Sequence, residues 1–278
     1  MSAQKLLISK RNSTFQVLAS LVSNRQKRQQ ARRFVVEGVQ PINIALAHGW
    51  QCEGVIYECG AALSRWAAEI VNRSSIPIRY EMTRDLLEEL SGKDDTSELL
   101  AVVTMPDETL DRIPIRPNLL VAIVDRPSNP GNLGTLIRSC DAFGVHAVVV
   151  TGHAVDPYDP ATITASRGSL FAIPVLRVAS PTDLRTWIAK VVRTLGTCRV
   201  VGADEKAPLD VDQHDFAQPT VAVFGNETQG LSRAYQDLCD TMVRIPMVGS
   251  ATSLNVSVAA AIILYEITRQ RRSAADQQ

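Results

Sequence analysis

The stretch LLVAIVDRPSNPGNLGTLIR, residues 119–138, decides the fold. It opens with six apolar residues, Leu119 to Val124, and an apolar run without period-two alternation indicates a strand covered on both faces. A turn rich in Pro, Gly and Asn follows, and the spacing beyond it predicts a helix from about Leu133 to Phe143. The next apolar run, HAVVV, predicts a second strand directly after that helix. A strand, a helix and a strand in succession indicate a parallel α/β sheet.

The same alternation continues toward the C-terminal end of the chain. Further strands are predicted at IPVLRV, CRVVGA and TVAVFG, and helices at about 161–170, 182–195 and 256–269. A turn-rich segment, MVRIPMVGSATSLN, precedes the last helix. The pattern therefore predicts a mainly parallel sheet flanked by helices.

A second, shorter α/β pattern precedes this one. The apolar runs FVVEG, GVIY, IPIRY and LLAVVT alternate with helix-like stretches at about 39–48, 61–72 and 84–90. The proline-rich TMPDETLDRIPIRPN then interrupts the periodicity. Because 278 residues can bury two cores, we predict one domain at 1–105, a linker at 106–117 and a second domain at 118–278.

Charge is balanced over the whole chain but not locally. Twenty-nine basic residues face 29 acidic ones, so attraction to a polyanion would need local clustering. Between Met1 and Arg33 there are eight lysines and arginines and no acidic residue. Taken alone, this basic arm is either a solvated, partly helical segment or a surface that binds phosphates.

Cysteines, histidines and apolar runs bear on the compartment and on metals. The five cysteines are scattered, without a C-x-x-C pair, and the four histidines lack ligand spacing, which argues against a disulfide framework and a zinc site. The longest apolar run, at about 256–265, is shorter than the roughly 20 residues that span a bilayer. The N-terminus lacks a signal-peptide pattern. We therefore expect a cytoplasmic protein with no membrane segment and no metal.

Three loops rich in glycine, asparagine and serine lie where ligands bind in open α/β sheets, beyond the carboxyl ends of strands. NPGNLGTLIR supplies Arg138, FGNETQGLS sets Glu227 between two glycines, and IPMVGSATSLN brings Ser253 and Asn255 to the entry of the last helix. Any one of these loops is explained by turn and capping chemistry alone. Together they predict a shared pocket. The fingerprint G-x-G-x-x-G is absent, which argues against a nicotinamide-dependent enzyme.

In order and spacing, N-P-G-N-x-G-x-x-x-R, F-G-N-E-x-x-G-L-S and I-P-M-x-G-x-x-x-S-L-N-V-S-V-A resemble the three motifs of the TrmH (SpoU) branch of the SPOUT methyltransferases. The match runs from about Asn118 to Arg271. The upstream RRFVVEGVQPINIALAHGW resembles the start of the L30e-like substrate domain that many of these enzymes carry. Over its full length the chain is similar to 23S rRNA ribose methyltransferases of the avilamycin-resistance type.

The resemblance implies a fold, a donor and a site. The fold would be an L30e-like domain followed by an α/β domain with a trefoil knot, and the enzyme would be a homodimer that builds each site from both subunits. S-adenosylmethionine (AdoMet) would be the methyl donor. The residues implied at the donor are Gly225, Asn226, Ile245, Met247 and Leu254. The residues implied in catalysis are Arg138, Asn132, Glu227, Ser253 and Asn255.

The family assigns the position of Arg138 the role of general base. A guanidinium, with a pKa above about 12, is a poor base. We therefore expect Arg138 to hold a phosphate and to stabilise developing alkoxide charge, while Asn132, Ser253 and Asn255 orient it and the ribose.

The resemblance also implies an RNA substrate, with the ribose 2′-hydroxyl of ribosomal RNA as the methyl acceptor. Beside an L30e-like domain, the basic arm is expected to clamp the RNA backbone. The side chains expected to do so are Arg25, Lys27, Arg28, Arg32 and Arg33. Two alternatives stay open, a transfer RNA methyltransferase and a non-catalytic RNA-binding protein, and the modification could serve antibiotic resistance or housekeeping.

Overall fold

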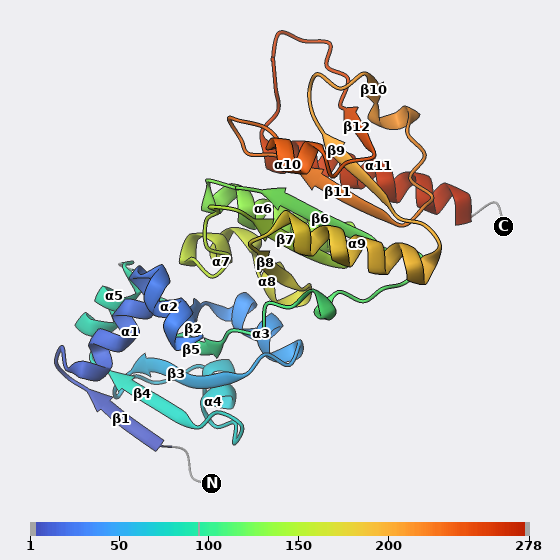
Figure 1. The fold of residues 1–278 in the computed structure, drawn as a ribbon. Helices are drawn as coiled ribbons and strands as arrows, with labels where there is room; N and C mark the ends of the chain where they lie inside the picture. Colours follow the sequence, from blue (N-terminus) through green and yellow to red (C-terminus); the bar gives the residue numbers. More distant parts are fainter. Residues whose placement is uncertain (1–3, 94, 276–278) are drawn as a thin grey trace. The chain divides into compact units, whose positions relative to one another are not determined.

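The computed structural model describes residues 4–93 and 95–275, and the chain divides into two compact units (Figure 1). One unit comprises the chain up to Asp107 together with Tyr158–Ala172. The other comprises Glu108–Pro157 and the chain from Ile173 onward. No helix among the described residues combines the length and the apolar character needed to cross a membrane.

The first unit is built on a five-stranded mixed sheet in the order β1-β4-β3-β5-β2. Strands β1, β4 and β3 are parallel, and β5 runs antiparallel to both β3 and β2. The strands are β1 (Gln4–Ile8), β2 (Arg33–Glu37), β3 (Cys52–Glu58), β4 (Ile78–Met82) and β5 (Leu99–Thr104). Helices α3 (Val39–Ala47), α4 (Arg65–Val71) and α5 (Arg84–Ser91) connect them. The α/β pattern predicted between Phe34 and Thr104 is therefore present.

The basic N-terminal segment is predicted as an arm, but from Gln4 onward it is folded into the first unit, which corrects that prediction. Its first three residues lie outside the described residues. Strand β1 joins the sheet beside β4, and helices α1 (Ser13–Ser23) and α2 (Arg25–Ala31) follow. The side chain of Asn12 caps α1 by accepting from the Phe15 N–H at 2.9 Å. Phe15, Leu18 and Leu21 recur at helical spacing and are buried. These apolar positions fold the segment onto the core despite its charge.

The helix predicted near 161–170 is two helices, because the chain turns within it. Helix α7 (Pro160–Ser166) and helix α8 (Ser169–Ala172) are separated by Arg167 and Gly168, both at positive φ. Both helices belong to the first unit, although they follow β7 in sequence. The Trp50 indole N–H donates to the Phe171 carbonyl at 3.0 Å, and the Phe34 and Tyr158 rings lie 4.6 Å apart. Burial of these aromatic rings holds the segment in that unit.

The second unit contains a seven-stranded parallel sheet in the order β10-β12-β9-β11-β6-β7-β8, as the apolar runs predicted. The strands are β6 (Leu120–Asp125), β7 (Ala147–Thr151), β8 (Val175–Val178), β9 (Arg199–Ala203), β10 (Leu209–Asp210), β11 (Thr220–Phe224) and β12 (Thr241–Arg244). Every residue of β6, β7 and β11 is buried. Strand β12 was not predicted, because TMVR has neither an apolar run nor alternation.

Helices cover both faces of this sheet (Figure 1). Helix α9 (Pro181–Leu195) packs Leu184, Trp187 and Val191 into one core with alternate residues of β6 and β7. Helices α6 (Pro130–Ala142) and α11 (Val256–Ala275) pack against each other on the opposite face. The Arg271 guanidinium near the end of α11 donates to the carbonyls of Phe216, Asn118, Leu119 and Gln218. These contacts hold the C-terminal part of α11 against the segments that lead into β6 and β11.

Candidate active site

The loops after β6, β9, β11 and β12 meet at one edge of the parallel sheet, since neighbouring parallel strands end on the same side. There the loops after β9, β11 and β12, together with the start of α11, line a cavity of about 330 Å³. Its lining comes from residues 203–206 after β9, from 224–230 after β11, from Val243, Arg244, Ile245 and Met247 in and after β12, from Ser253 and Leu254 before α11, and from Val256, Ala259 and Ile263 of α11. Two of the three loops singled out in the sequence therefore line one pocket, and the third borders it through hydrogen bonds.

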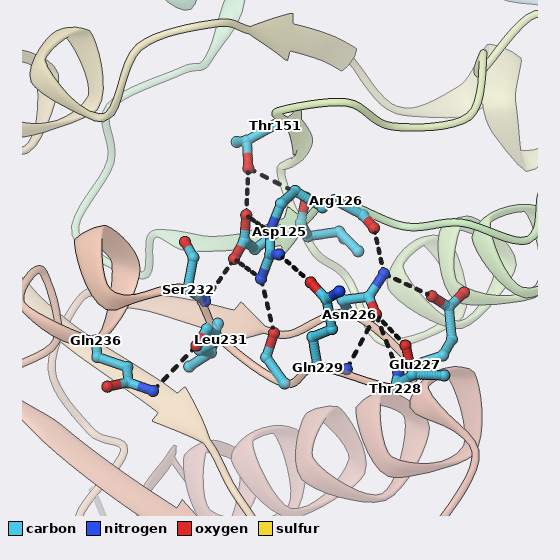
Figure 2. A network of polar contacts seen from close by, with 12 residues as sticks. Asp125, Arg126, Thr151, Asn226, Glu227, Thr228, Gln229, Leu231, Ser232 and Gln236 are labelled. Carbon is cyan, nitrogen blue, oxygen red and sulfur yellow. Dashed lines mark hydrogen bonds and ion pairs between the residues drawn. The ribbon is translucent and has the colours of Figure 1, made fainter.

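The loop after β11 makes a tight return that needs glycine. The backbones of Asn226 and Gly230 exchange two N–H···O hydrogen bonds of 3.0 Å. A Cβ on Gly225 would lie 2.5 Å from the Leu231 nitrogen and 2.8 Å from Gly230 Cα, both backbone atoms. The Asn226 carboxamide closes the turn by accepting from Thr228 and Gln229 (Figure 2). The backbone of Gly225 thus forms a wall of the pocket that no side chain can occupy.

A chain of hydrogen bonds joins the three loops. Glu227 accepts at 3.2 Å from the Asn132 carboxamide, which stands in the first turn of α6. The Asn132 oxygen accepts in turn from the Asn255 carboxamide at 3.0 Å. Asn132, Glu227 and Asn255 come from segments far apart in sequence, and the structure brings them together as predicted.

Glu227 is held as a carboxylate by the donors around it. Its two oxygens accept from the Ser128 hydroxyl and N–H at 2.8 and 3.1 Å and from the Asn129 N–H at 3.3 Å. Burial by itself would raise the pKa of Glu227, but hydrogen bonds from its own backbone, Ser128 and Asn132 outweigh burial and lower that pKa. A carboxylate so stabilised is a weak proton acceptor and a firm anchor for Asn132.

Asn255 also caps the last helix. Its side-chain oxygen accepts from the Ser257 N–H at 2.9 Å and from the Ser257 hydroxyl at 2.7 Å. The same carboxamide therefore caps α11 with its oxygen and contacts Asn132 with its nitrogen. Ser253, which precedes the same helix, lines the pocket.

The five residues predicted at the donor all line the cavity: Gly225, Asn226, Ile245, Met247 and Leu254. The prediction missed Asp204, Glu205 and Lys206, which line it from the loop after β9. That loop also follows a strand of the sheet, and its position at a strand exit is the signal that could have identified it.

Arg138 stands apart from the pocket lining. It lies on the exposed side of α6, six residues beyond Asn132, and its guanidinium has no hydrogen bond or ion pair with any residue that the structure describes. Its neighbours on that face of the helix, Thr135 and Ser139, line an apolar groove of about 340 Å³ with residues of α11.

The five basic residues predicted to bind RNA fall into two groups. Arg25 and Lys27 are exposed on α2, and Arg32 and Arg33 are partly exposed, paired with Asp107 and Glu53. Arg28 is buried, and its guanidinium donates to the carbonyls of Leu21 and Val22 and pairs with Asp159. Arg28 therefore does not offer its charge to a phosphate, which corrects the prediction for that residue: its helix position turns it toward the core.

Comparison with known proteins gives the family. Residues 119–265 match the SpoU rRNA Methylase family, and residues 12–101 match the SpoU L30e-like domain. The chain belongs to the SpoU rRNA methylase family. The predicted family, the predicted fold class and the predicted enzyme class, an RNA methyltransferase, are thereby confirmed.

Relatives of this SpoU methylase cover nearly its whole length. A 23S rRNA (uridine 2479 2′-O)-methyltransferase of Streptomyces viridochromogenes is 47% identical over 96% of this chain and 93% of its own. The structure of the SpoU methyltransferase AviRb of that organism, in complex with AdoMet, superposes with a TM-score of 0.89 at 46% identity and covers 95% of this chain and 99% of its own. An AdoMet-bound rRNA methyltransferase from Sinorhizobium meliloti gives a TM-score of 0.83 at 27% identity, covering 96% and 98%.

Proposed function

We propose that this SpoU methylase transfers a methyl group from AdoMet to the ribose 2′-hydroxyl of a nucleotide in 23S rRNA. The observation that carries the proposal is the hydrogen-bonded chain from Glu227 through Asn132 to Asn255, which joins the three motif loops at the edge of the pocket. The full-length similarity to a 23S rRNA uridine 2′-O-methyltransferase supports the substrate. Such a substrate places the reaction in the cytoplasm.

The pocket suits AdoMet in size and in chemistry. A cavity of about 330 Å³ lies within the range of small-molecule sites. Ile245, Met247 and Leu254 provide apolar surface for the adenine ring, and Gly225 contributes backbone to the lining. The carboxylates of Asp204 and Glu205 lie at the same pocket and can accept hydrogen bonds from donor hydroxyl or ammonium groups.

The reaction makes two demands on the protein. AdoMet carries its methyl group on a sulfonium. The 2′-oxygen forms a bond to the methyl carbon as the sulfur–carbon bond breaks, S-adenosylhomocysteine leaves with that electron pair, and the hydroxyl proton passes to water. We assign Asn132 and Asn255 to orientation of the ribose, with Glu227 fixing Asn132, because positioning of the attacking oxygen is the larger need when the electrophile is already strong. We assign Ser253 to the orientation of the ribose as well. Arg138 is assigned as the cation that holds a phosphate and offsets the developing alkoxide charge.

We also propose that the enzyme is a homodimer joined through α6 and α11. Val258, Ile262 and Tyr265 recur at helical spacing and are 46%, 37% and 49% exposed. They line the apolar groove together with Thr135 and Ser139 of α6. A second copy would cover this surface, and Arg138, on the same face of α6, would then reach the pocket of the partner subunit.

Mixing two inactive variants tests whether sites are shared. In a heterodimer of Arg138→Ala and a pocket variant such as Gly225→Ala, one site would combine an intact pocket with an intact Arg138 from the other chain. We expect activity to return to a substantial fraction of wild type on mixing. No recovery, with heterodimers verified by tagged copurification, would place Arg138 in the site of its own chain. Ile262→Glu should give monomers in sedimentation velocity.

The exposed basic residues of the first unit are proposed to bind RNA. Arg25, Lys27, Arg32 and Arg33 provide charge for phosphates, and their joint replacement by Gln should weaken RNA binding and flatten its salt dependence. Arg28→Gln serves as the contrast, since it should lower the melting temperature. Donor affinity should stay unchanged in the fourfold variant.

Methylation mapping tests the proposed function directly. Purified protein is incubated with labelled AdoMet and either 23S rRNA or transfer RNA, and 2′-O-methylation is mapped by nucleotide. We expect label in one nucleotide of 23S rRNA and none when that nucleotide carries a 2′-deoxy sugar. Label in transfer RNA alone would show that the substrate is transfer RNA, and RNA binding without methyl transfer to either RNA would contradict the proposed reaction. The role in antibiotic resistance stays a prediction, tested by growth of an expressing strain on ribosome-targeting drugs.

A further inference from the structure

Asp125 and Arg126, which are adjacent in sequence, form an ion pair beside the loop after β11, with the carboxylate buried and the guanidinium partly exposed. Asp125 ends β6 and is 1% exposed, and Arg126 follows it with φ at +53°, a conformation that costs free energy for a residue other than glycine. The Arg126 guanidinium turns back onto its neighbour, with Nε 3.1 Å from Oδ1 and Nη2 3.1 Å from Oδ2. Gly152 makes room for it, because a Cβ there would lie 2.6 Å from Arg126 Cγ. Strained backbone that the surroundings hold in place is a reason to look for a role.

Asp125 and Arg126 form hydrogen bonds with both ends of the loop after β11 (Figure 2). Arg126 Nη1 donates to the Gln229 side-chain oxygen at 2.7 Å, and Nη2 donates to the Gly230 carbonyl at 3.1 Å. The Arg126 carbonyl accepts from the Asn226 carboxamide at 2.7 Å. The Asp125 carboxylate accepts from the Ser232 N–H at 2.8 Å, beyond the other end of the loop.

The loop residues that bond to the ion pair line the pocket, whereas Asp125 and Arg126 do not. Asn226, Gln229 and Gly230 line the cavity, and Glu227 stands between them. Neither Asp125 nor Arg126 is among the lining residues. The pair can therefore act on the donor only through the loop.

We infer that Asp125 and Arg126 are positioning residues for methyl transfer: their ion pair holds the loop from Asn226 to Gly230 in the conformation that binds the donor. The role rests on the proposed function, because it assumes that the pocket binds AdoMet. A fixed loop presents the Gly225 wall and the Glu227 carboxylate without reorganisation on binding. Without the ion pair, the loop would have to become ordered when the donor binds, and the free energy of that ordering would lower the affinity for the donor.

A second ion pair in the same unit supplies a matched control. Arg177 forms a fork with Glu108 at 2.7 and 2.8 Å, and its side chain is 24% exposed, against 27% for Arg126. Neither Arg177 nor Glu108 lines the pocket. Arg177→Gln therefore breaks a comparable pair without touching the loop, and any loss of stability that it shares with Arg126→Gln is the structural part of the effect.

The test measures donor affinity and folding in the full chain. S-adenosylhomocysteine, the demethylated product, is titrated calorimetrically into wild type, Arg126→Gln, Arg126→Lys and Arg177→Gln, and each protein is melted without ligand. We expect Arg126→Gln to weaken binding of S-adenosylhomocysteine by at least about tenfold, because tenfold corresponds to the loss of one hydrogen bond to a charged group. The KM for AdoMet should rise as well. Arg126→Lys keeps the charge but not the fork and should lie between Arg126→Gln and wild type. Arg177→Gln should bind like wild type.

Two outcomes overturn the inference. One is a folded Arg126→Gln protein that binds the product within twofold of wild type; the other is an equal weakening in Arg177→Gln, which would make the effect a general loss of stability. If Arg126→Gln does not fold, Arg126→Lys decides by the same criteria. A wild-type protein that binds neither AdoMet nor the product would instead defeat the proposed function.

Discussion

Gly225→Ala should abolish tight donor binding while leaving most of the fold intact. The added Cβ would lie 2.5 Å from the Leu231 nitrogen, whereas ordinary contact begins at 3.4 Å, so backbone must retreat by about 0.9 Å. No side-chain rotation can relieve the overlap, because the neighbouring atoms are backbone atoms of Gly230 and Leu231. Overpacking of this kind costs about 1–3 kcal/mol.

The same retreat displaces the wall of the pocket. If about 2–3 kcal/mol of that overpacking cost falls on the donor-binding conformation, the dissociation constant for S-adenosylhomocysteine rises about 30- to 100-fold, which is the effect we expect. Isothermal titration calorimetry measures the affinity, and thermal unfolding monitored by circular dichroism checks that the variant is folded.

Gly249→Ala is the matched control. Gly249 lies in the loop before α11, and a Cβ there meets nothing within 4 Å. It should bind the product as wild type does. If folded Gly225→Ala bound within threefold of wild type, the loop after β11 would not form the donor wall, and the assignment of the pocket would be refuted.

Three further predictions concern the framework of the site and of the first unit. Hydrogen bonds hold the folded-state pKa of Glu227 below its unfolded value, so its contribution to stability is complete above the unfolded pKa of about 4.3 and is lost as pH falls through the folded pKa. The melting temperature should therefore fall more steeply with decreasing pH for wild type than for Glu227→Gln. Parallel plots of melting temperature against pH would contradict the lowered pKa. Arg271→Lys cannot satisfy the carbonyls that the guanidinium binds and should lower the free energy of unfolding by about 1–3 kcal/mol, whereas Arg272→Lys, exposed on the next position of α11, should change the melting temperature by less than a degree or so. Gly168→Ala places a Cβ onto Ile44 Cδ1 and should destabilise more than Gly60→Ala, where φ is also positive but nothing lies within 4 Å; equal melting temperatures would show that contact with Ile44 does not matter.

The parallel sheet was predictable because its strands carry their own signal. Strands such as β6 and β11 are buried on both faces, so that nearly every residue is apolar. Strand β1 includes Gln4 and Lys5 and carries no such signal, and its place beside β4 depends on a partner more than 70 residues away. The register of β1 against β4 depends on contacts between residues far apart in sequence, which a local sequence pattern cannot predict. The same is true of the packing of α7 and α8 with Trp50.

The candidate site divides in the same way. Asn132, Glu227 and Asn255 stand out because turn and capping residues at three strand exits match one family, and their hydrogen-bonded chain needed only the fold to bring them together. Asp125 and Arg126 gave no signal, since the carboxylate ends an apolar strand and the pairing of adjacent residues requires a left-handed backbone at Arg126. Arg28 was misassigned because a count of charges cannot tell which face of α2 meets the core.

The central claim, that segments after β9, β11 and β12 form one donor pocket, is tested most directly by hydrogen exchange of the full chain with and without S-adenosylhomocysteine. The claim predicts slower exchange of backbone amides at 203–206, 225–230 and 245–256, and little change in the sheet of the first unit. Saturating binding with unchanged exchange in these three segments, or protection elsewhere alone, would contradict it.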